Sequence, residues 1–253
     1  MSPDCEKMTC MCGRFAMDEK TNDLIEQFVL EGNDYRDWVP SFSIAPTDWA
    51  PIIREKRDSV TGEVIRRVEP AVWDFHPAFI TDSKRPQFNA RIETVASNGM
   101  WKNAFAANRC IVPMRGYYEW TGEAGAKRAH FLHGQARMLA AAGIFTARKV
   151  PGDAGDEVWQ VSTAIITREA RDASGEVHDR MPVFLDSEVY DRWLSPERLA
   201  DDAQKDDMLA LLHEVSTVQA GRISSYEVDR RVNNSRTVDP GDPTLVDPID
   251  PPG

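Results

Sequence analysis

The chain has 253 residues, of which 42% are hydrophobic and 28% charged, with a net charge of −11 and a sequence pI of about 5.0. These values are typical of a globular protein of one large or two small domains. No apolar run approaches the roughly 20 residues of a membrane span, and the first ten residues lack the apolar core of a secretory signal. The negative net charge alone argues against nucleic-acid binding, although basic residues are more frequent between Arg54 and Arg115.

Three of the four cysteines, Cys5, Cys10 and Cys12, lie in the first dozen residues, and the fourth is Cys110. This spacing does not resemble a disulfide framework, and without an export signal it favours a reducing cytoplasm. It is also poor spacing for zinc, because there is no CxxC pair and no paired histidine. We therefore expect no metal and no cofactor.

The predicted elements begin with a helix over 21–31, where Thr21 or Asn22 can cap the start and Gly32 follows the end. Short strands follow at 42–45, 51–56 and 64–73, the last two forming a hairpin around 58–63. Short helices are expected at 93–98 and 100–107, strands at 110–113, 117–120, 130–133, 138–144 and 159–167, helices at 186–194 and 201–215, and a last strand at 223–232.

Many short strands without a βαβ rhythm predict an α+β fold. We expect one domain, with a curled, mainly antiparallel, barrel-like sheet flanked by short helices. It would span residues 11–236. Residues 1–10 are interpreted as a disordered leader or a misassigned start, and residues 237–253 as a Pro/Asp-rich disordered tail that cannot bury a core.

Cys12 is the most informative single residue if it becomes the first residue of the chain. An N-terminal cysteine carries an α-amine and a thiol, with reference pKa values near 8 and 8.5. An aldehyde can condense with the amine to a Schiff base, and the thiol can then close a thiazolidine ring. An internal cysteine cannot do this, because its nitrogen belongs to an amide. The function therefore depends on whether the residues before Cys12 persist.

Four further segments contain candidate functional residues. Asn89 and Arg91 are two apart, so on an extended segment they project to one side, where an amide and a guanidinium can bind one polar ligand. The alternative is a loop whose Asn caps the next helix. Glu119 is flanked by aromatic residues, and desolvation would raise its pKa toward a value suited to acid/base work. The alternative is an outward-facing Glu on an amphipathic strand.

His178 lies beside Asp179 and Arg180, as in a proton shuttle, but a loop histidine bonded to backbone is the simpler interpretation. The aromatic segment 73–79 is a possible stacking platform for unpaired bases, or a buried strand end. No P-loop, GxGxxG, GxSxG or HExxH motif occurs, and no local signature supports a papain-like thiol protease.

Taken together, the motifs resemble the SOS response-associated peptidase (SRAP) family of abasic-site processing proteins. The matching stretches are MCGRF at 11–15, SIAP at 43–46, NARIETV at 89–95, NRCIVPMRGYYEW at 108–120, HDRMPVFL at 178–185 and VDRRVNN at 228–234. The chain departs from the family at Ser43, where Asn is usual, and in its aromatic loop at Asp74 and Phe79. In the family the cysteine normally follows the initiator Met directly.

The resemblance implies a sensor of abasic sites in single-stranded DNA that forms a thiazolidine crosslink, with Cys12 as the nucleophile. Asn89 would hold the sugar, Glu119 would act as acid/base, and His178 would move protons and promote reversal. The DNA-binding residues it implies are Arg14, Ser43, Trp73, Phe75, Pro77, Phe79 and Arg91. The expected partner is single-stranded DNA with abasic sites, and no membrane; the protein is expected to be a cytoplasmic monomer, nucleoid-associated in a bacterium. A thiol autopeptidase that removes its own leader and a non-covalent single-strand binder are the alternatives.

Overall fold

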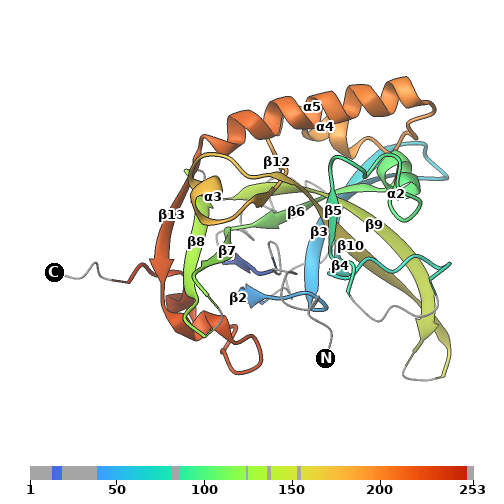
Figure 1. Cartoon of the computed structure of the whole chain (residues 1–253). Helices are drawn as coiled ribbons and strands as arrows, with labels where there is room; N and C mark the ends of the chain where they lie inside the picture. The colour runs from blue at the N-terminus through green and yellow to red at the C-terminus, as the bar shows by residue number, and fades with distance from the viewer. Residues whose placement is uncertain are drawn as a thin grey trace, which may run out of the picture.

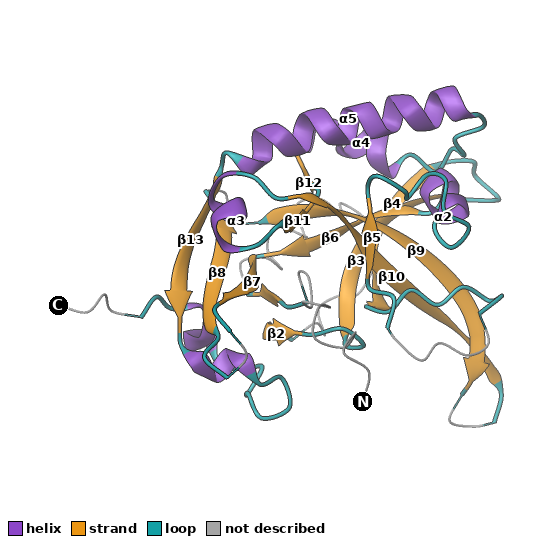
Figure 2. Ribbon diagram, viewed as in Figure 1, coloured by secondary structure: helices purple, strands orange, loops and turns teal. Residues whose placement is uncertain are grey.

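The computed structural model describes residues 13–18, 39–80, 86–123, 125–135, 138–152 and 155–249. The predicted helix at 21–31, the segment 1–10 and Cys12 therefore lie outside the described residues. Within the described ranges the fold is α+β, as predicted, with two sheets and a few short helices (Figures 1 and 2). Among the residues that the structure describes, no helix is long and apolar enough to cross a membrane.

Five strands close into a barrel. They are β3 (Trp49–Arg57), β4 (Val64–Val72), β6 (Arg109–Met114), β9 (Leu139–Pro151) and β10 (Glu157–Glu169). Each pairs with two neighbours, in the ring β10-β4-β3-β6-β9-β10, and every pairing except β10–β4 is antiparallel. The closed ring confirms the expected barrel-like, mainly antiparallel sheet. Closure leaves these five strands with no exposed edge.

Three short strands join the barrel at its rim. They are β5 (Asn89–Arg91), β11 (Arg180–Pro182) and β12 (Phe184–Leu185). β5 and β11 both pair with the last residues of β10, and β12 pairs with β9. Sequence patterning predicted neither β11 nor β12, since runs of two or three residues are too short to display a period.

A second, five-stranded sheet has the order β13-β8-β7-β1-β2. Its strands are β1 (Phe15–Met17), β2 (Ser41–Ile44), β7 (Gly116–Thr121), β8 (Arg128–Gly134) and β13 (Ile223–Val228). One face joins the main core with the barrel, while Tyr118 and Phe131 belong to a smaller cluster on the other. The predicted strand at 223–232 ends early, because residues 230–233 form a 3-10 turn.

The helices lie outside the strands. α5 (Asp202–Ala220) crosses the top of the molecule as drawn, above β12, with α4 (Tyr190–Leu194) below it (Figure 1). α2 (Lys102–Ala107) and α3 (Asp172–Val177) are single turns or little more, and α3 was not predicted. The helix expected at 93–98 is a series of turns, because Ser97 and Asn98 bond local backbone groups instead.

The expectation of a disordered tail differs from the structure over residues 239–249. A 3-10 turn spans Pro243–Val246, and Leu245 is fully buried. The main-chain N–H of Phe42 donates to the Pro240 carbonyl, and the Tyr226 hydroxyl donates to the Val246 carbonyl. A single buried leucine and hydrogen bonds to distant strands hold this Pro/Asp-rich segment, and composition does not reveal such contacts. Residues 250–253 lie outside the described part.

Candidate functional site

The end of β10 pairs with the two strands in or next to which three candidate residues lie. Its residues Ile165–Thr167 pair in parallel with Asn89–Arg91, and Thr167–Glu169 pair antiparallel with Arg180–Pro182. Asn89 and Arg91 therefore lie on one side of this strand end, and His178, two residues before β11, lies near the other. The two motifs are far apart in sequence, and only the pairing with β10 joins them.

Asn89 is partly buried and Arg91 is exposed. Their predicted placement on one extended segment is confirmed, since both belong to β5. Alternation along a strand gives the two side chains a common face. The exposed guanidinium of Arg91 is thus available to an anion, and the alternative of an Asn capping a following helix is wrong, because turns follow β5.

His178 ends α3, and its side chain is buried. Its Nδ1 accepts a hydrogen bond from the main-chain N–H of Arg180 at 3.0 Å, which leaves the proton of the neutral ring on Nε2. The exposed carboxylate of Asp179 lies 2.9 Å from the same Nδ1. Because Nδ1 cannot accept from an N–H and donate to a carboxylate at once, its contacts with the Arg180 N–H and with the Asp179 carboxylate are alternatives.

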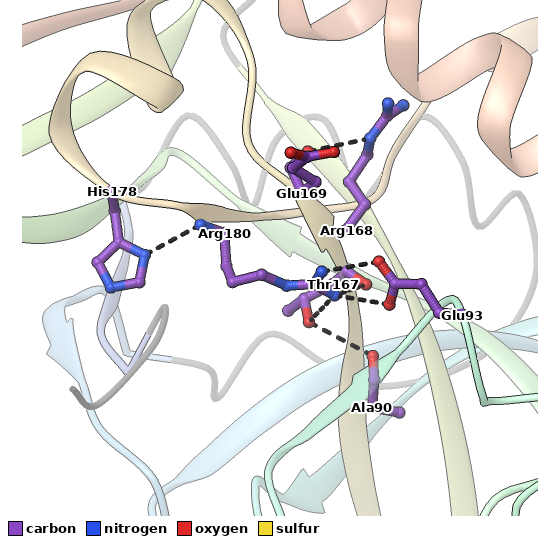
Figure 3. A network of polar contacts seen from close by, with 7 residues as sticks. All are labelled: Ala90, Glu93, Thr167, Arg168, Glu169, His178 and Arg180. Carbon is purple, nitrogen blue, oxygen red and sulfur yellow. Dashed lines mark hydrogen bonds and ion pairs between the residues drawn. The ribbon is translucent and has the colours of Figure 1, made fainter. Parts of the chain in front are cut away.

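A buried arginine ties the two sides of this strand end together (Figure 3). Arg180 makes a two-pronged ion pair with Glu93 at 2.7 and 3.0 Å, and donates to the Thr167 carbonyl at 2.8 Å. The hydrogen bonds from Arg180 hold the pKa of the Glu93 carboxyl below its ordinary value. Sequence reasoning gave Arg180 and Glu93 no role of their own, although both lie within the matching motifs.

Glu119 lies on β7 and is 1% exposed, so the burial expected for it is confirmed and the outward-facing alternative is wrong. Tyr117 shares its face, since they are two apart on a strand. The Tyr117 hydroxyl is 2.8 Å from Oγ of Ser174, in the helix that His178 ends, and the His178 N–H donates to the Ser174 carbonyl. The face of β7 that carries Glu119 is thus turned toward the element that positions His178.

Arg14 immediately precedes β1 and is buried. Its Nη1 donates to Oγ of Ser43 at 3.2 Å and to the Val232 carbonyl at 2.7 Å, and its guanidinium lies 5.6 Å from the ring centroid of Trp120. The structure therefore brings the predicted residues Arg14 and Ser43 together. Both are mostly covered by protein.

β1 connects these residues to the start of the described chain. It pairs with β2 and with β7, and Gly13 before it is buried. Cys12 itself lies outside the described residues, so the structure does not test its position. The strand that follows it is fixed between the strands of Ser43 and Glu119.

The residues of the aromatic segment 73–79 differ in their exposure. Trp73 and Phe75 are buried: Trp73 packs edge-on against Phe15, with centroids 4.9 Å apart, and Phe75 packs against Trp101. Pro77 is buried too, while Phe79 is 63% exposed. For Trp73 and Phe75 the buried-strand-end interpretation is therefore correct, and of this segment only Phe79 offers an aromatic face to a ligand.

The candidate residues comprise a buried carboxyl, an imidazole that accepts a hydrogen bond at Nδ1, an amide and an exposed guanidinium. Such groups can transfer protons and bind an anion. Among the described residues, no group of His, Cys, Asp and Glu side chains is placed to hold a metal ion.

Comparison with known proteins gives the class. The family model described as SOS response associated peptidase (SRAP) matches residues 11–235, and the chain belongs to this family. The abasic site processing protein YedK of Escherichia coli is 26% identical over 88% of this chain and 95% of its own length. The abasic site processing protein HMCES of Xenopus tropicalis is 25% identical over 91% of this chain and 77% of its own length.

Solved structures agree on the fold. A Bacteroides thetaiotaomicron protein superposes with a TM-score of 0.68 at 20% identity, covering 94% of this chain and all of its own. A phage-related protein of Bordetella bronchiseptica gives a TM-score of 0.58 at 26% identity, covering 87% of this chain and 95% of its own.

Proposed function

We propose that this protein processes abasic sites in single-stranded DNA by forming a thiazolidine crosslink through Cys12. One observation supports the proposal: the end of β10 pairs with β5, which carries Asn89 and Arg91, and with β11, which begins two residues after His178. The family membership and the names of the relatives support it. The acidic net charge is compatible with DNA binding when a few cations act locally.

The proposed crosslinking reaction needs no cofactor. The free amine of Cys12 adds to the aldehyde of the ring-opened abasic sugar, and the carbinolamine loses water to give an imine. The thiol then adds to the imine carbon, and its proton moves to the nitrogen. Carbinolamine dehydration needs an acid, for which we propose Glu119, and proton movement at the imine and in the reverse reaction we assign to His178.

The other residues bind and orient the DNA. We assign Asn89 to the sugar and the exposed Arg91 to a phosphate beside the lesion. Arg14, held by Ser43, adds positive charge beneath the start of β1. Phe79 is assigned to stacking on an adjacent base, and the buried Trp73 and Phe75 to holding its loop.

A second candidate, self-removal of residues 1–11, follows from the residues that precede Cys12 in the sequence. As long as the Met11–Cys12 peptide bond exists, the amine is locked in an amide. Hydrolysis of this bond consumes one water and frees the amine, and we assign it to Cys12 with Glu119 and His178. With the bond intact, the site would bind the lesion without the thiazolidine.

The decisive test is a denaturing gel after incubation with single-stranded DNA that contains one abasic site. We expect a shifted band from the wild type, none from Cys12→Ala, and an unchanged band from Cys110→Ala. Cys110 is the matched control because it is fully buried, which raises the pKa of its thiol to about 12 and keeps it unreactive.

The crosslinking proposal fails if a protein shown by mass spectrometry to begin at Cys12 gives no shifted band. The same mass measurement tests self-removal. An intact leader after expression would contradict it, whereas loss of the leader in the wild type but not in Glu119→Gln would support it.

A further inference from the structure

The connection between β10 and β11 carries His178, and its own sequence gives this connection little stability. It contains α3, a helix of six residues, and a helix of that length is marginal in water without packing. Arg171 at its N-cap makes no side-chain capping bond among the described residues. Asp172 has a φ of 52°, in the left-handed region that a non-glycine residue rarely adopts. Contacts with the rest of the molecule must therefore hold α3 in place.

One such contact is a buried hydrogen bond between two hydroxyl groups. Ser174 is the buried residue of α3, and its hydroxyl lies 2.8 Å from the hydroxyl of Tyr117 on β7, which is buried as well. A buried hydroxyl without a partner costs free energy, so this bond favours one position of α3. α3 accordingly lies against β7, β8 and β13 (Figure 1).

The position of α3 determines where His178 begins. The main-chain N–H of His178 donates to the Ser174 carbonyl at 2.9 Å, which is the C-terminal bond of the helix. On the other side, Nδ1 of His178 accepts from the Arg180 N–H at 3.0 Å. This residue is thus held from two directions, by β11 through Arg180 and by β7 through Tyr117 and Ser174.

Tyr117 also relates His178 to the strand of Glu119. Tyr117 and Glu119 are two apart on β7, and alternate residues of a strand project to one face. The Tyr117 ring packs against Phe184 in β12, with ring centroids 5.7 Å apart. Segments on both sides of β11 therefore contact Tyr117, since Ser174 precedes this strand and Phe184 follows it.

We propose that Tyr117 is a positioning residue for the crosslinking reaction, which acts through Ser174 to hold His178 where it moves protons at the imine. This inference deepens the proposed function and rests on it. General acid–base catalysis requires the acid and the base to lie within hydrogen-bond reach of the protons they transfer. A hydrogen bond between the elements that support Glu119 and His178 maintains this relation, and no contact of Tyr117 with the DNA is needed.

The first test needs no crosslink. Proton–nitrogen correlation NMR spectra at neutral pH detect the ring nitrogens of the five histidines, and His178→Ala assigns the His178 signals by their loss. Tyr117→Phe and Ser174→Ala each remove the hydrogen bond, one from either side. We expect both variants to move the His178 signals in the same way, because both release α3.

Tyr118→Phe is the matched control, and we expect it to leave the His178 signals unchanged. Tyr118 follows Tyr117 on β7 but belongs to the cluster on the other face of the sheet. Its buried hydroxyl donates to the Phe42 carbonyl at 2.8 Å. The control therefore removes a buried tyrosine hydrogen bond from the same strand, on the side away from Ser174.

The second test measures reversal. The crosslink to a labelled abasic oligonucleotide is chased with an excess of unlabelled abasic oligonucleotide, and its decay is followed on denaturing gels. We expect His178→Ala to slow reversal about 100-fold and Tyr117→Phe about tenfold, because acid–base groups contribute roughly 100- to 10,000-fold and the phenylalanine variant keeps the imidazole. Combined with His178→Ala, Tyr117→Phe should have no further effect.

Binding separates positioning from a loss of fold. Kd for a single-stranded oligonucleotide with a tetrahydrofuran residue, which mimics the lesion but has no aldehyde, should be the same for Tyr117→Phe and the wild type. Weaker binding by Tyr117→Phe would contradict the inference. It is also overturned if Tyr117→Phe leaves the His178 signals or the reversal rate unchanged, or slows reversal equally with and without His178.

The two proposals can fail separately. A wild type that never crosslinks abasic DNA, while Tyr117→Phe moves the His178 signals, contradicts the thiazolidine and leaves the positioning of His178 standing. A wild type that crosslinks, while the His178 signals and the reversal rate do not respond to Tyr117→Phe, contradicts only the role of Tyr117.

Discussion

At the scale of single residues, Arg180 connects the segments on both sides of the end of β10. Its side chain reaches Glu93 and Thr167, and its main-chain N–H donates to Nδ1 of His178. A charge this deeply buried must be paired, because an isolated buried ion costs several kcal/mol. The pairing requirement thus keeps β5 and β11 in a fixed relation.

This pairing predicts a pH-dependent stability. The pKa of Glu93 is lowered in the folded state, so its contribution is present above the ordinary value near 4.5 and is lost as pH falls through the lowered one. We expect Glu93→Gln to be less stable than the wild type at pH 7 by about 1 kcal/mol, a figure reduced for solvent screening because the carboxylate is half-exposed.

The difference between Glu93→Gln and the wild type should shrink as pH falls below the ordinary pKa near 4.5 and through the lowered one, because the wild-type carboxylate then loses its charge. Thermal melts from pH 3 to pH 8 would measure it, with Glu188→Gln as a surface control. A constant difference across this range would show that the ion pair does not carry the effect.

At the scale of elements, short helices depend on side chains that satisfy their last carbonyls. Arg109 donates to the carbonyls of Phe105 and Ala106 in α2, to that of Trp193 in α4, and to those of Ser195 and Glu197 beyond it. Burial lowers its pKa to about 10, so it remains charged at neutral pH. This one side chain joins α2 and α4 to β6.

We expect Arg109→Met to lower the free energy of unfolding by about 3 kcal/mol, because several buried carbonyls lose their donor while the apolar volume is largely kept. Arg109→Lys should recover only part of this, since an ammonium has fewer donors in a different geometry. Urea unfolding would measure both. Equal stability of Met and Lys variants would indicate that packing, not hydrogen bonding, accounts for the loss.

At the scale of the whole molecule, the C-terminal segment covers both edges of the five-stranded sheet. Near its start, the Pro240 carbonyl accepts from Phe42 in β2, and near its end the Ile249 N–H donates to the Glu227 carbonyl in β13. Uncovered edges tend to pair with other chains. The segment therefore protects the sheet whose inner strands carry Glu119 and follow Cys12.

Removal of residues 238–253 should therefore produce self-association, detectable by light scattering after size-exclusion chromatography, and a lower Tm. Leu245→Ala should cost about 2 to 3 kcal/mol without exposing the edges, because it empties a fully buried site. Deletion of residues 250–253 alone is the control. A truncated protein with the same oligomeric state as the full chain would contradict the edge-covering role.

Prediction from the sequence succeeded where a signal is local. Prediction located the strands around 51–56, 64–73 and 159–167 and the helix that begins near 201. Their signals are a hairpin turn, alternation and a helix cap, which depend only on neighbouring residues. Prediction failed at β11, β12 and residues 93–98, where tertiary pairing or local side-chain bonds override short-range propensity.

For the site, the sequence by itself determined the chemistry: a cysteine near the start, a carboxyl, an imidazole, an amide and arginines in motifs that match one family. The tertiary structure alone decided their relations. It buried Trp73 and Phe75 and left Phe79 exposed, and it joined Asn89 and His178 through β10. Residue types fix which reactions are available, whereas exposure and proximity depend on contacts between residues far apart in the chain, which no local pattern encodes.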